Sequence, residues 1–248
     1  MRLFTRFMLS LSFMLAMSSV LYGLIDGKEH PPQGPKVLIA GNARALIGLA
    51  SEPESPIRIL LLGTSITARG DWPEGLQTAL SECSTHPLRI SRLARAGGSS
   101  DWGVTALKAH LTNPAMPRPD IVVIEFTVND ASVWHGLPLS ISRKRTLELI
   151  AAIRAEQSVP FLATMNPAWG RNALERLGQS RYQAVYRDLA LETGSGLIDS
   201  IPDWQALSEA ERRLMLPDGL HPTAAGMEKI VIPAFFEALS PLICPRVD

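Results

Sequence analysis

The feature of this sequence that most constrains its fold is the alternation, from residue 57 onward, of short apolar runs with longer stretches of helical periodicity. Two of the runs, Ile59–Leu62 and Ile121–Ile124, are unbroken series of aliphatic residues. Strands that are buried on both faces show such continuous runs, whereas strands with one solvated face alternate. The sequence predicts five strands, at Ile57–Gly63, Leu88–Ala94, Asp120–Thr127, Val159–Asn166 and Gly196–Asp199.

The stretches between these runs place apolar residues at the spacing of one helix face. This spacing occurs at Leu76, Ala79, Leu80 and Cys83, and again at Tyr182, Val185, Tyr186 and Leu189. A last helix after Pro222 should bury residues between 227 and 235 and be kinked at Pro233. Strands alternating with helices predict an α/β fold, a parallel sheet covered on both faces, whose ligands bind at the carboxyl ends of the strands.

Composition narrows the classes of partner. The chain has 24 Lys and Arg against 24 Asp and Glu, so no overall charge favours a nucleic acid as partner. Four histidines, His30, His86, His110 and His135, are scattered without the spacing of metal ligands. We therefore expect neither a metal nor a cofactor.

The amino-terminal segment has the pattern of an export signal. Arg2 and Arg6 precede a charge-free apolar run from Phe7 to Ile25, which is long enough to cross a bilayer as a helix. We expect residues 1–25 to be a signal anchor, with a cleaved signal peptide and a buried helix as alternatives. The rest of the chain is then exported to the periplasm or another extracytoplasmic space, anchored to the cytoplasmic membrane.

Residues 26–56 are rich in proline and predict a linker, with a short helix at Val37–Ala50, before a domain at 57–248. The two cysteines, Cys83 and Cys244, are far apart in the sequence. Export would permit a disulfide between them, and two separate buried thiols are the alternative.

Two segments supply the parts of a nucleophilic site. Ser65 follows the first strand directly, where a strand-to-helix turn exposes a hydroxyl at the edge of the sheet. Asp218 and His221 flank a turn before the last helix, so the carboxylate can orient the imidazole that accepts the serine proton. Each segment alone is a common turn or cap, but their joint occurrence favours nucleophilic catalysis.

Two other segments supply hydrogen-bond donors for an oxyanion. Gly97 and Gly98 follow the second strand and allow a backbone N–H to approach a ligand closely. Asn129 follows the third strand and offers a side-chain amide at the same edge. Both segments also suit ordinary turns and helix caps.

Together the four segments resemble the conserved blocks of the SGNH hydrolases, also called GDSL esterases and lipases. The matching stretches are Gly63-Thr64-Ser65-Ile66, Gly97-Gly98-Ser99-Ser100, Val128-Asn129-Asp130 and Asp218-Gly219-Leu220-His221-Pro222. Departures from the family pattern include Thr64, where Asp is usual, and Thr127, where Gly is usual.

The resemblance implies a three-layer α/β/α sandwich with a five-stranded parallel sheet in the flavodoxin-like order 2-1-3-4-5. It also implies Ser65 as nucleophile, His221 as base and Asp218 as its partner. The oxyanion donors would be Ser65, Gly97 and Asn129, with Gly98 as an alternative to Gly97.

The resemblance predicts a serine ester hydrolase that acts through an acyl-enzyme on an envelope or extracellular ester, such as an O-acetylated glycan or a lipid ester. The alternatives are an O-acyltransferase with the same Ser-His-Asp site and a non-catalytic envelope binding protein. Trp72, Trp102, Trp134 and Trp169 follow strands and could line a substrate pocket or pack on the core. The sequence leaves the oligomeric state open.

Overall fold

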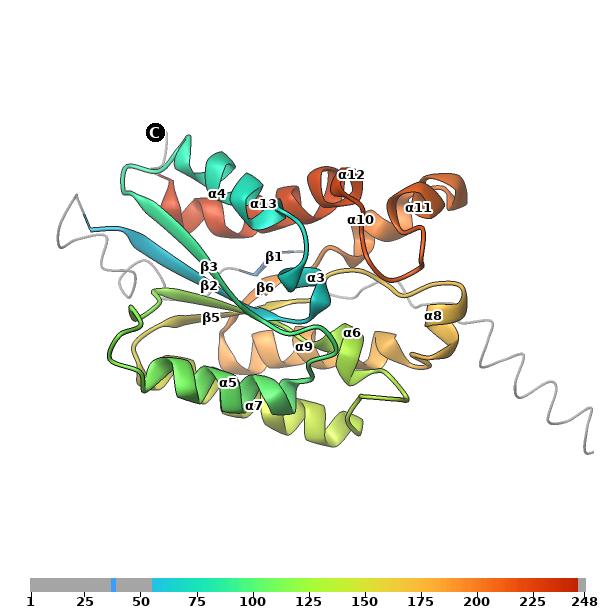
Figure 1. Ribbon diagram of the computed structural model, residues 1–248, viewed down its shortest axis with the longest axis horizontal. Helices are drawn as coiled ribbons and strands as arrows, with labels where there is room; N and C mark the ends of the chain where they lie inside the picture. Colours follow the sequence, from blue (N-terminus) through green and yellow to red (C-terminus); the bar gives the residue numbers. More distant parts are fainter. Residues whose placement is uncertain (1–36, 39–54, 245–248) are drawn as a thin grey trace, which may run out of the picture. The chain divides into compact units, whose positions relative to one another are not determined.

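The computed structural model describes residues 37–38 and 55–244 of the chain, and the expected signal segment at 1–25 lies outside them (Figure 1). Its centre is a six-stranded sheet in the order β1-β6-β5-β4-β2-β3. The strands are β1 (Val37–Leu38), β2 (Ile57–Gly63), β3 (Leu88–Ala94), β4 (Ile121–Glu125), β5 (Val159–Ala163) and β6 (Gly196–Ile198).

The five strands from β2 to β6 are all parallel and correspond to the five strands expected from the sequence. Numbered from β2, their order is the expected 2-1-3-4-5, and the fold class is confirmed. Strands β2 and β4 lie side by side at the centre, where every residue of β4 is buried. The register pairs Gly63 with Glu125, so the two strands end together.

The sixth strand corrects one expectation about the segment before the domain. Val37–Leu38, expected as the start of a helix, forms β1 and pairs antiparallel with β6. The outer edge of β6 would otherwise carry unpaired backbone N–H and C=O groups, which an added strand satisfies. The remainder of the expected helix, residues 39–50, lies outside the described part of the chain.

Helices cover both faces of the sheet, which gives the three layers seen in Figure 1. One apolar core packs α4 (Trp72–Ser81) and α13 (Ile232–Ile243) against one face. A second core lies on the other face, beneath α5 (Ser100–Leu111), α7 (Leu139–Ala155) and α9 (Gln179–Thr193). Successive residues of β2 enter opposite cores, which is why its apolar run is continuous.

The last helical segment bears out the expected burial of Met227, Ile230, Val231, Ala234 and Phe235. It consists of α12 (Ala224–Gly226), the π-helical turn η1 (Met227–Val231) and α13. Pro233 has no N–H to donate to the carbonyl four residues earlier, and its ring crowds that carbonyl. The structure places a π turn at Met227–Val231, and α13 begins at Ile232 with Pro233 in its first turn, where a missing N–H costs no helical hydrogen bond.

Short helices complete the connections at α3 (Ser65–Ala68), α6 (Thr127–Asp130), α8 (Arg171–Leu174), α10 (Ile201–Ala206) and α11 (Glu209–Met215). A disulfide joins Cys83, just after α4, to Cys244, just after α13. Of the two alternatives for these cysteines, the structure therefore contains the disulfide and not two separate thiols. Within residues 37–38 and 55–244, no helix combines the length and apolarity that a membrane span requires.

Candidate active site

The nucleophilic turn lies where the central strand β2 ends. Thr64 adopts an extended conformation as the N-cap of α3, and Ser65 is the first residue of that helix. The first N–H groups of a helix have no partner within the helix, and among the described residues the N–H of Ser65 has no acceptor, so it can act as a donor. Helices α3 and α6 lie together at the carboxyl ends of the strands (Figure 1).

Ser65, His221 and Asp218 form a continuous chain of hydrogen bonds. The Oγ of Ser65 lies 2.8 Å from Nε2 of His221, and Nδ1 of the same ring lies 2.7 Å from Oδ2 of Asp218. The serine is buried to 7% exposure, whereas the Asp218 side chain is half exposed. The structure therefore brings together the three residues predicted as nucleophile, base and orienting acid.

The Asp218 carboxylate also receives backbone donors. Its Oδ1 accepts the N–H groups of Leu220 at 2.8 Å and His221 at 2.7 Å. Partial burial raises the pKa of Asp218, but these bonds and the His221 ring outweigh that effect and leave it below its ordinary value. Asp218 is thus held as an anion against Nδ1 of His221.

The turn that carries Asp218 is fixed by the segment after β5. The N–H of Trp169 donates to the carbonyl of Gly219 at 2.9 Å, and the Asn166 amide donates to the carbonyl of Leu220 at 2.9 Å. Gly219 has φ +77°, and an added Cβ would lie 2.3 Å from the Trp169 carbonyl oxygen. Only glycine suits this position, because the backbone is left-handed and the space is filled.

The candidate oxyanion donors lie in the loop before α5 and in the short helix α6. Asn129 Nδ2 donates one hydrogen to the carbonyl of Gly98 at 3.0 Å, which leaves its second hydrogen free. The N–H of Gly98 is used by the carbonyl of Arg95 at 2.9 Å, whereas within the described residues the N–H of Gly97 has no acceptor. This difference favours Gly97 over Gly98 as the donor.

Asp130 ties the glycine loop to the helix that carries Asn129, and sequence reasoning assigned it no role. Its carboxylate accepts the N–H of Ser100 at 2.8 Å and the hydroxyls of Ser100 and Ser142, both at 2.6 Å. Burial raises the pKa of Asp130, although the serine hydrogen bonds oppose the change.

Glu125 is a second functional side chain that sequence reasoning missed. It is the last residue of β4, 1% exposed, and its carboxylate faces the nucleophilic turn. The Oε2 atom accepts the N–H of Thr64 at 2.9 Å, the Thr64 hydroxyl at 2.9 Å and the Thr67 hydroxyl at 3.0 Å. One carboxylate therefore holds the turn on both sides of Ser65.

Gly63 makes room for that carboxylate. A Cβ at position 63 would lie 2.5 Å from Oε2 of Glu125 and 2.6 Å from Oγ1 of Thr67. The contact also accounts for Thr64, where the family usually has Asp, because in this chain a threonine hydroxyl donates to Glu125 and an aspartate would oppose it. An acidic residue ending an otherwise apolar buried strand was the available sequence signal for Glu125.

The surroundings of Glu125 disfavour its charge. Burial raises the pKa of Glu125 to about 7, with a smaller contribution from the neighbouring Asp130, while hydrogen bonds from Thr64 and Thr67 act in the opposite direction. The hydroxyl of Tyr186 accepts the N–H of Phe126, the residue that follows Glu125. Burial raises the pKa of Tyr186, and the negative charges of Asp130 and Glu125 raise it further. Glu125 therefore changes its charge near neutral pH.

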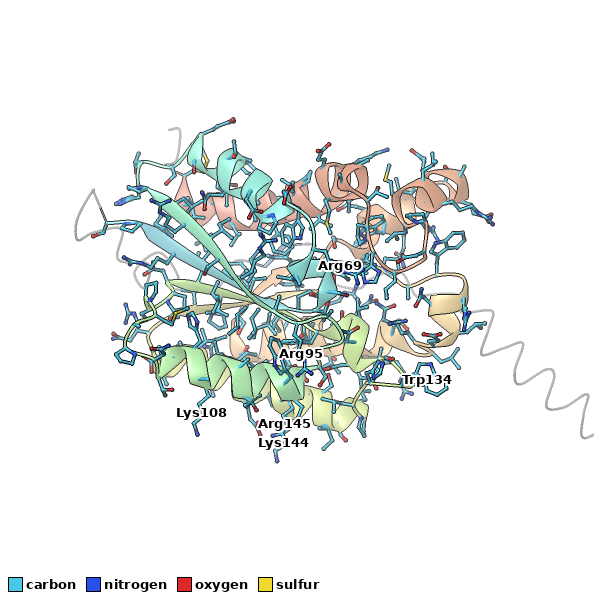
Figure 2. All side chains as sticks on the ribbon, in the orientation of Figure 1. Arg69, Arg95, Lys108, Trp134, Lys144 and Arg145 are labelled. Atoms are coloured by element: carbon cyan, nitrogen blue, oxygen red, sulfur yellow. A yellow bond between two sulfur atoms is a disulfide. The ribbon has the colours of Figure 1, made fainter. Side chains whose placement is uncertain are left out.

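The four tryptophans have different environments. Trp72 is buried at 4% exposure beside Ser65, and Trp102 packs edge-on against Phe126 in the core. Trp169 is half-buried and donates to the carbonyl of Leu216. Trp134 is 71% exposed and points outward in Figure 2. Of the four, only Trp72 adjoins the pocket that Ser65 and His221 line.

Comparisons with known proteins identify the family of the chain. The sequence model of the GDSL-like Lipase/Acylhydrolase family matches residues 61–229. No curated protein matches the sequence. Among solved structures, a lipase/acylhydrolase from Enterococcus faecalis superposes with a TM-score of 0.63 at 22% identity, covering 77% of this chain and 99% of that one.

Two further structures share the fold. An acetylxylan esterase from Geobacillus stearothermophilus has a TM-score of 0.59 at 20% identity, with 78% of this chain and 99% of that chain covered. A GDSL-like lipase from Bacteroides thetaiotaomicron has a TM-score of 0.58 at 15% identity, with 82% and 97% covered. The chain belongs to the GDSL-like lipase/acylhydrolase family and is an SGNH-type esterase.

Proposed function

We propose that this esterase acts through an acyl-enzyme formed on Ser65. The observation that carries the proposal is the hydrogen-bonded chain from Ser65 Oγ through the His221 ring to Asp218. In that order the three groups serve as nucleophile, general base and orienting anion. The free N–H groups of Ser65 and Gly97 and the Asn129 amide supply the complementary donors for an oxyanion.

In the first step Nε2 of His221 takes the proton of Ser65 as Oγ attacks the ester carbonyl. The carbonyl oxygen becomes negative and accepts hydrogen bonds from Ser65, Gly97 and Asn129. The tetrahedral intermediate then expels the alcohol, which receives the proton from His221, and leaves an acyl-serine. Water attacks this acyl-serine with the same ring as base, releasing the acid and restoring the serine.

Labelling with a fluorophosphonate tests the nucleophile directly. The wild-type protein should be labelled at Ser65, as mass spectrometry of the labelled peptide would show, and Ser65→Ala should be neither labelled nor active. His221→Ala should lose nearly as much activity, and Asp218→Ala less, because groups that act as a unit are not additive. Labelling elsewhere, or several per cent of activity in Ser65→Ala, would refute the assignment.

We further propose that the enzyme acts outside the cytoplasm, attached to the membrane by residues 1–25, on an envelope or extracellular ester. Arg2 and Arg6 precede the apolar run, and positive residues favour the cytoplasmic side, which directs the domain outward. Full-length protein should sediment with membranes, resist carbonate extraction and be digested by protease added to spheroplasts. Protection of the domain from protease would contradict export.

A further inference from the structure

A pocket opens directly beside the reacting groups. Ser65 and His221 both border it, and it extends between α4 and the segment from α12 to α13, with a volume of about 420 Å³. Gly97, Gly98 and Asn129 do not line it. From Ser65, the pocket therefore extends toward α4 and α13, and the candidate oxyanion donors lie outside it.

The inner wall of this pocket is apolar and firmly held. Ile66, Trp72, Met227 and Ile232 are the large apolar residues of the wall. The Trp72 indole N–H donates to the carbonyl of Ile66 at 3.0 Å, and its ring meets Phe235 edge-on at 5.1 Å between centroids. A wall fixed in this way is preorganised, so an apolar group can enter without first ordering the side chains it contacts.

Charged side chains are confined to the rim of the pocket. Arg69, Asp71 and Glu228 border it and are exposed, and Figure 2 shows Arg69 beside α3. A polar part of a ligand can remain hydrated there while an apolar part is covered. The pocket thus combines an apolar wall with a charged, hydrated rim, which suits an ester that carries a hydrocarbon chain.

The volume distinguishes between short and long chains. At roughly 30 Å³ per water, about 420 Å³ corresponds to on the order of fourteen water molecules. The methyl group of an acetyl ester would displace about one of them, whereas a chain of several carbons would displace several and bury itself against the apolar wall.

We propose that this pocket binds a hydrocarbon chain of the scissile ester and that Gly75 sets the length it accepts. The inference rests on the proposed acyl-enzyme function and adds the substrate class, an ester with a chain of several carbons. Gly75 lies within α4, where glycine is less favourable than alanine because it has more backbone freedom to lose. Its hydrogen faces the opposite wall, since an added Cβ would lie 3.1 Å from Cδ1 of Ile232.

Two substitutions should change the pocket in opposite directions. Gly75→Leu places a branched side chain in the pocket wall, in tight contact with Ile232, and should shorten the accepted chain. Ile232→Ala removes part of the facing wall and should lengthen it. Thr78→Leu is the matched control, because it introduces the same side chain at an exposed position of the same helix, outside the pocket.

The measurement is kcat/KM for p-nitrophenyl esters from acetate to octanoate, and for alkyl acetates from ethyl to octyl. In one of these two series, either the p-nitrophenyl esters or the alkyl acetates, wild-type kcat/KM should rise by up to about fourfold per added methylene over the first several carbons. In Gly75→Leu, the ratio of kcat/KM on the longest good substrate to kcat/KM on acetate should fall roughly tenfold or more relative to wild type. Ile232→Ala should move the optimum to longer chains, and Thr78→Leu should match wild type.

The series that shows the rise tells whether the acid or the alcohol carries the chain. Equal kcat/KM across both series, or a Gly75→Leu profile that parallels wild type, would overturn the inference. Fluorophosphonate labelling of Ser65 in each variant separates the two proposals. Labelled protein without a chain-length preference refutes only the pocket assignment, whereas unlabelled wild-type protein refutes the proposed nucleophile.

Discussion

Glu125 holds the nucleophilic turn without touching substrate in the proposed mechanism. Its carboxylate accepts donors from Thr64 and Thr67, the residues on either side of the Ser65–Ile66 pair. Since Ser65 contributes both its hydroxyl and its N–H to the proposed chemistry, a shift of this turn would displace two functional groups at once. Glu125 is therefore best described as a positioning residue.

The space that Gly63 leaves for Glu125 gives a first prediction. Gly63→Ala should destabilise the protein by about 1–3 kcal/mol, since the new methyl group must push the buried carboxylate or Thr67 aside. Urea unfolding measures the change. Activity should fall as well, because the displaced groups hold Ser65.

Gly194→Ala serves as the control for this substitution. Gly194 has φ +63° but no atoms within 4 Å of an added Cβ, so this variant reports backbone strain without crowding. It should cost about 1 kcal/mol and leave activity intact. Full activity in Gly63→Ala would mean that the Glu125 contact does not position the serine.

The raised pKa of Glu125 gives a second prediction, on stability. An acid whose pKa is higher in the folded state binds its proton more tightly there, so its contribution to stability is present below pH 4.5 and is lost as the pH rises through about 7. A shift from 4.5 to about 7 corresponds to about 3 kcal/mol. Glu125→Gln, which does not ionise, should therefore gain stability relative to wild type between pH 5 and pH 8.

Urea unfolding of both proteins at several pH values in this interval tests the sign. The quantity to follow is the difference in unfolding free energy between variant and wild type, which removes the titration of all other groups that the two share. A difference that stays constant from pH 5 to pH 8, or that falls, would contradict the assignment of a raised pKa to Glu125.

At the level of secondary-structure elements, Asp130 fixes how α5 meets α6. The carboxylate at the end of α6 accepts the first N–H and the hydroxyl of α5, and also a hydroxyl from the first turn of α7. Because Gly97 precedes α5 and Asn129 lies in α6, this junction sets the spacing of two of the proposed oxyanion donors.

Asp130→Asn should loosen that junction. The amide cannot accept at both positions that the carboxylate occupies, so at least one buried donor loses its partner, at about 1–3 kcal/mol. We expect lower stability, faster hydrogen exchange in the first turn of α5 and a reduced kcat.

Asp101→Asn is the matched control for this change. Asp101 also lies in the first turn of α5, but its side chain is 54% exposed and pairs with Arg145 at the surface. Exposed ion pairs contribute about 0–1 kcal/mol, so this variant should behave like wild type. Equal effects of the two substitutions would show that charge near α5, rather than the junction, is what matters.

At the level of the whole molecule, the disulfide closes the α4–α13 layer. Cys83 and Cys244 are separated by 161 residues, and their Cα atoms lie 5.1 Å apart. Cross-linking so long a loop restricts the unfolded chain, and such bonds typically stabilise proteins by about 2–5 kcal/mol.

Cys83→Ser should accordingly lower the unfolding free energy by about 2–5 kcal/mol, and adding a reductant to wild type should have a similar effect. Thermal unfolding with and without reductant measures both. The double variant with Cys244→Ser should respond no further to reductant. An unchanged melting temperature of wild type in reductant would show that the bond is absent in solution.

The sequence by itself was sufficient for the class of fold and for the residues proposed to react. The continuous apolar run of β2 reports its burial on both faces directly. Both β2 and the edge strand β3 have the bounds expected from the sequence, and the parallel order was implied by the family resemblance. Ser65, Asp218 and His221 were recognisable because each lies in a short local pattern next to an element boundary. Such short local patterns can be recognised in the amino-acid sequence alone.

Only the tertiary structure decided the contacts between segments that are distant in the chain. Glu125 meets Thr64 across 61 residues, and Asp130 meets Ser100 across 30. Strand β1 comes from a segment expected to be helical and pairs with β6. The open edge of β6 supplies backbone hydrogen-bond partners, which the helix propensity of the local sequence does not take into account. The chain order states which residues are neighbours along the backbone, whereas the packing of separate elements determines which carboxylates become buried, which donors they hold and where a pocket remains.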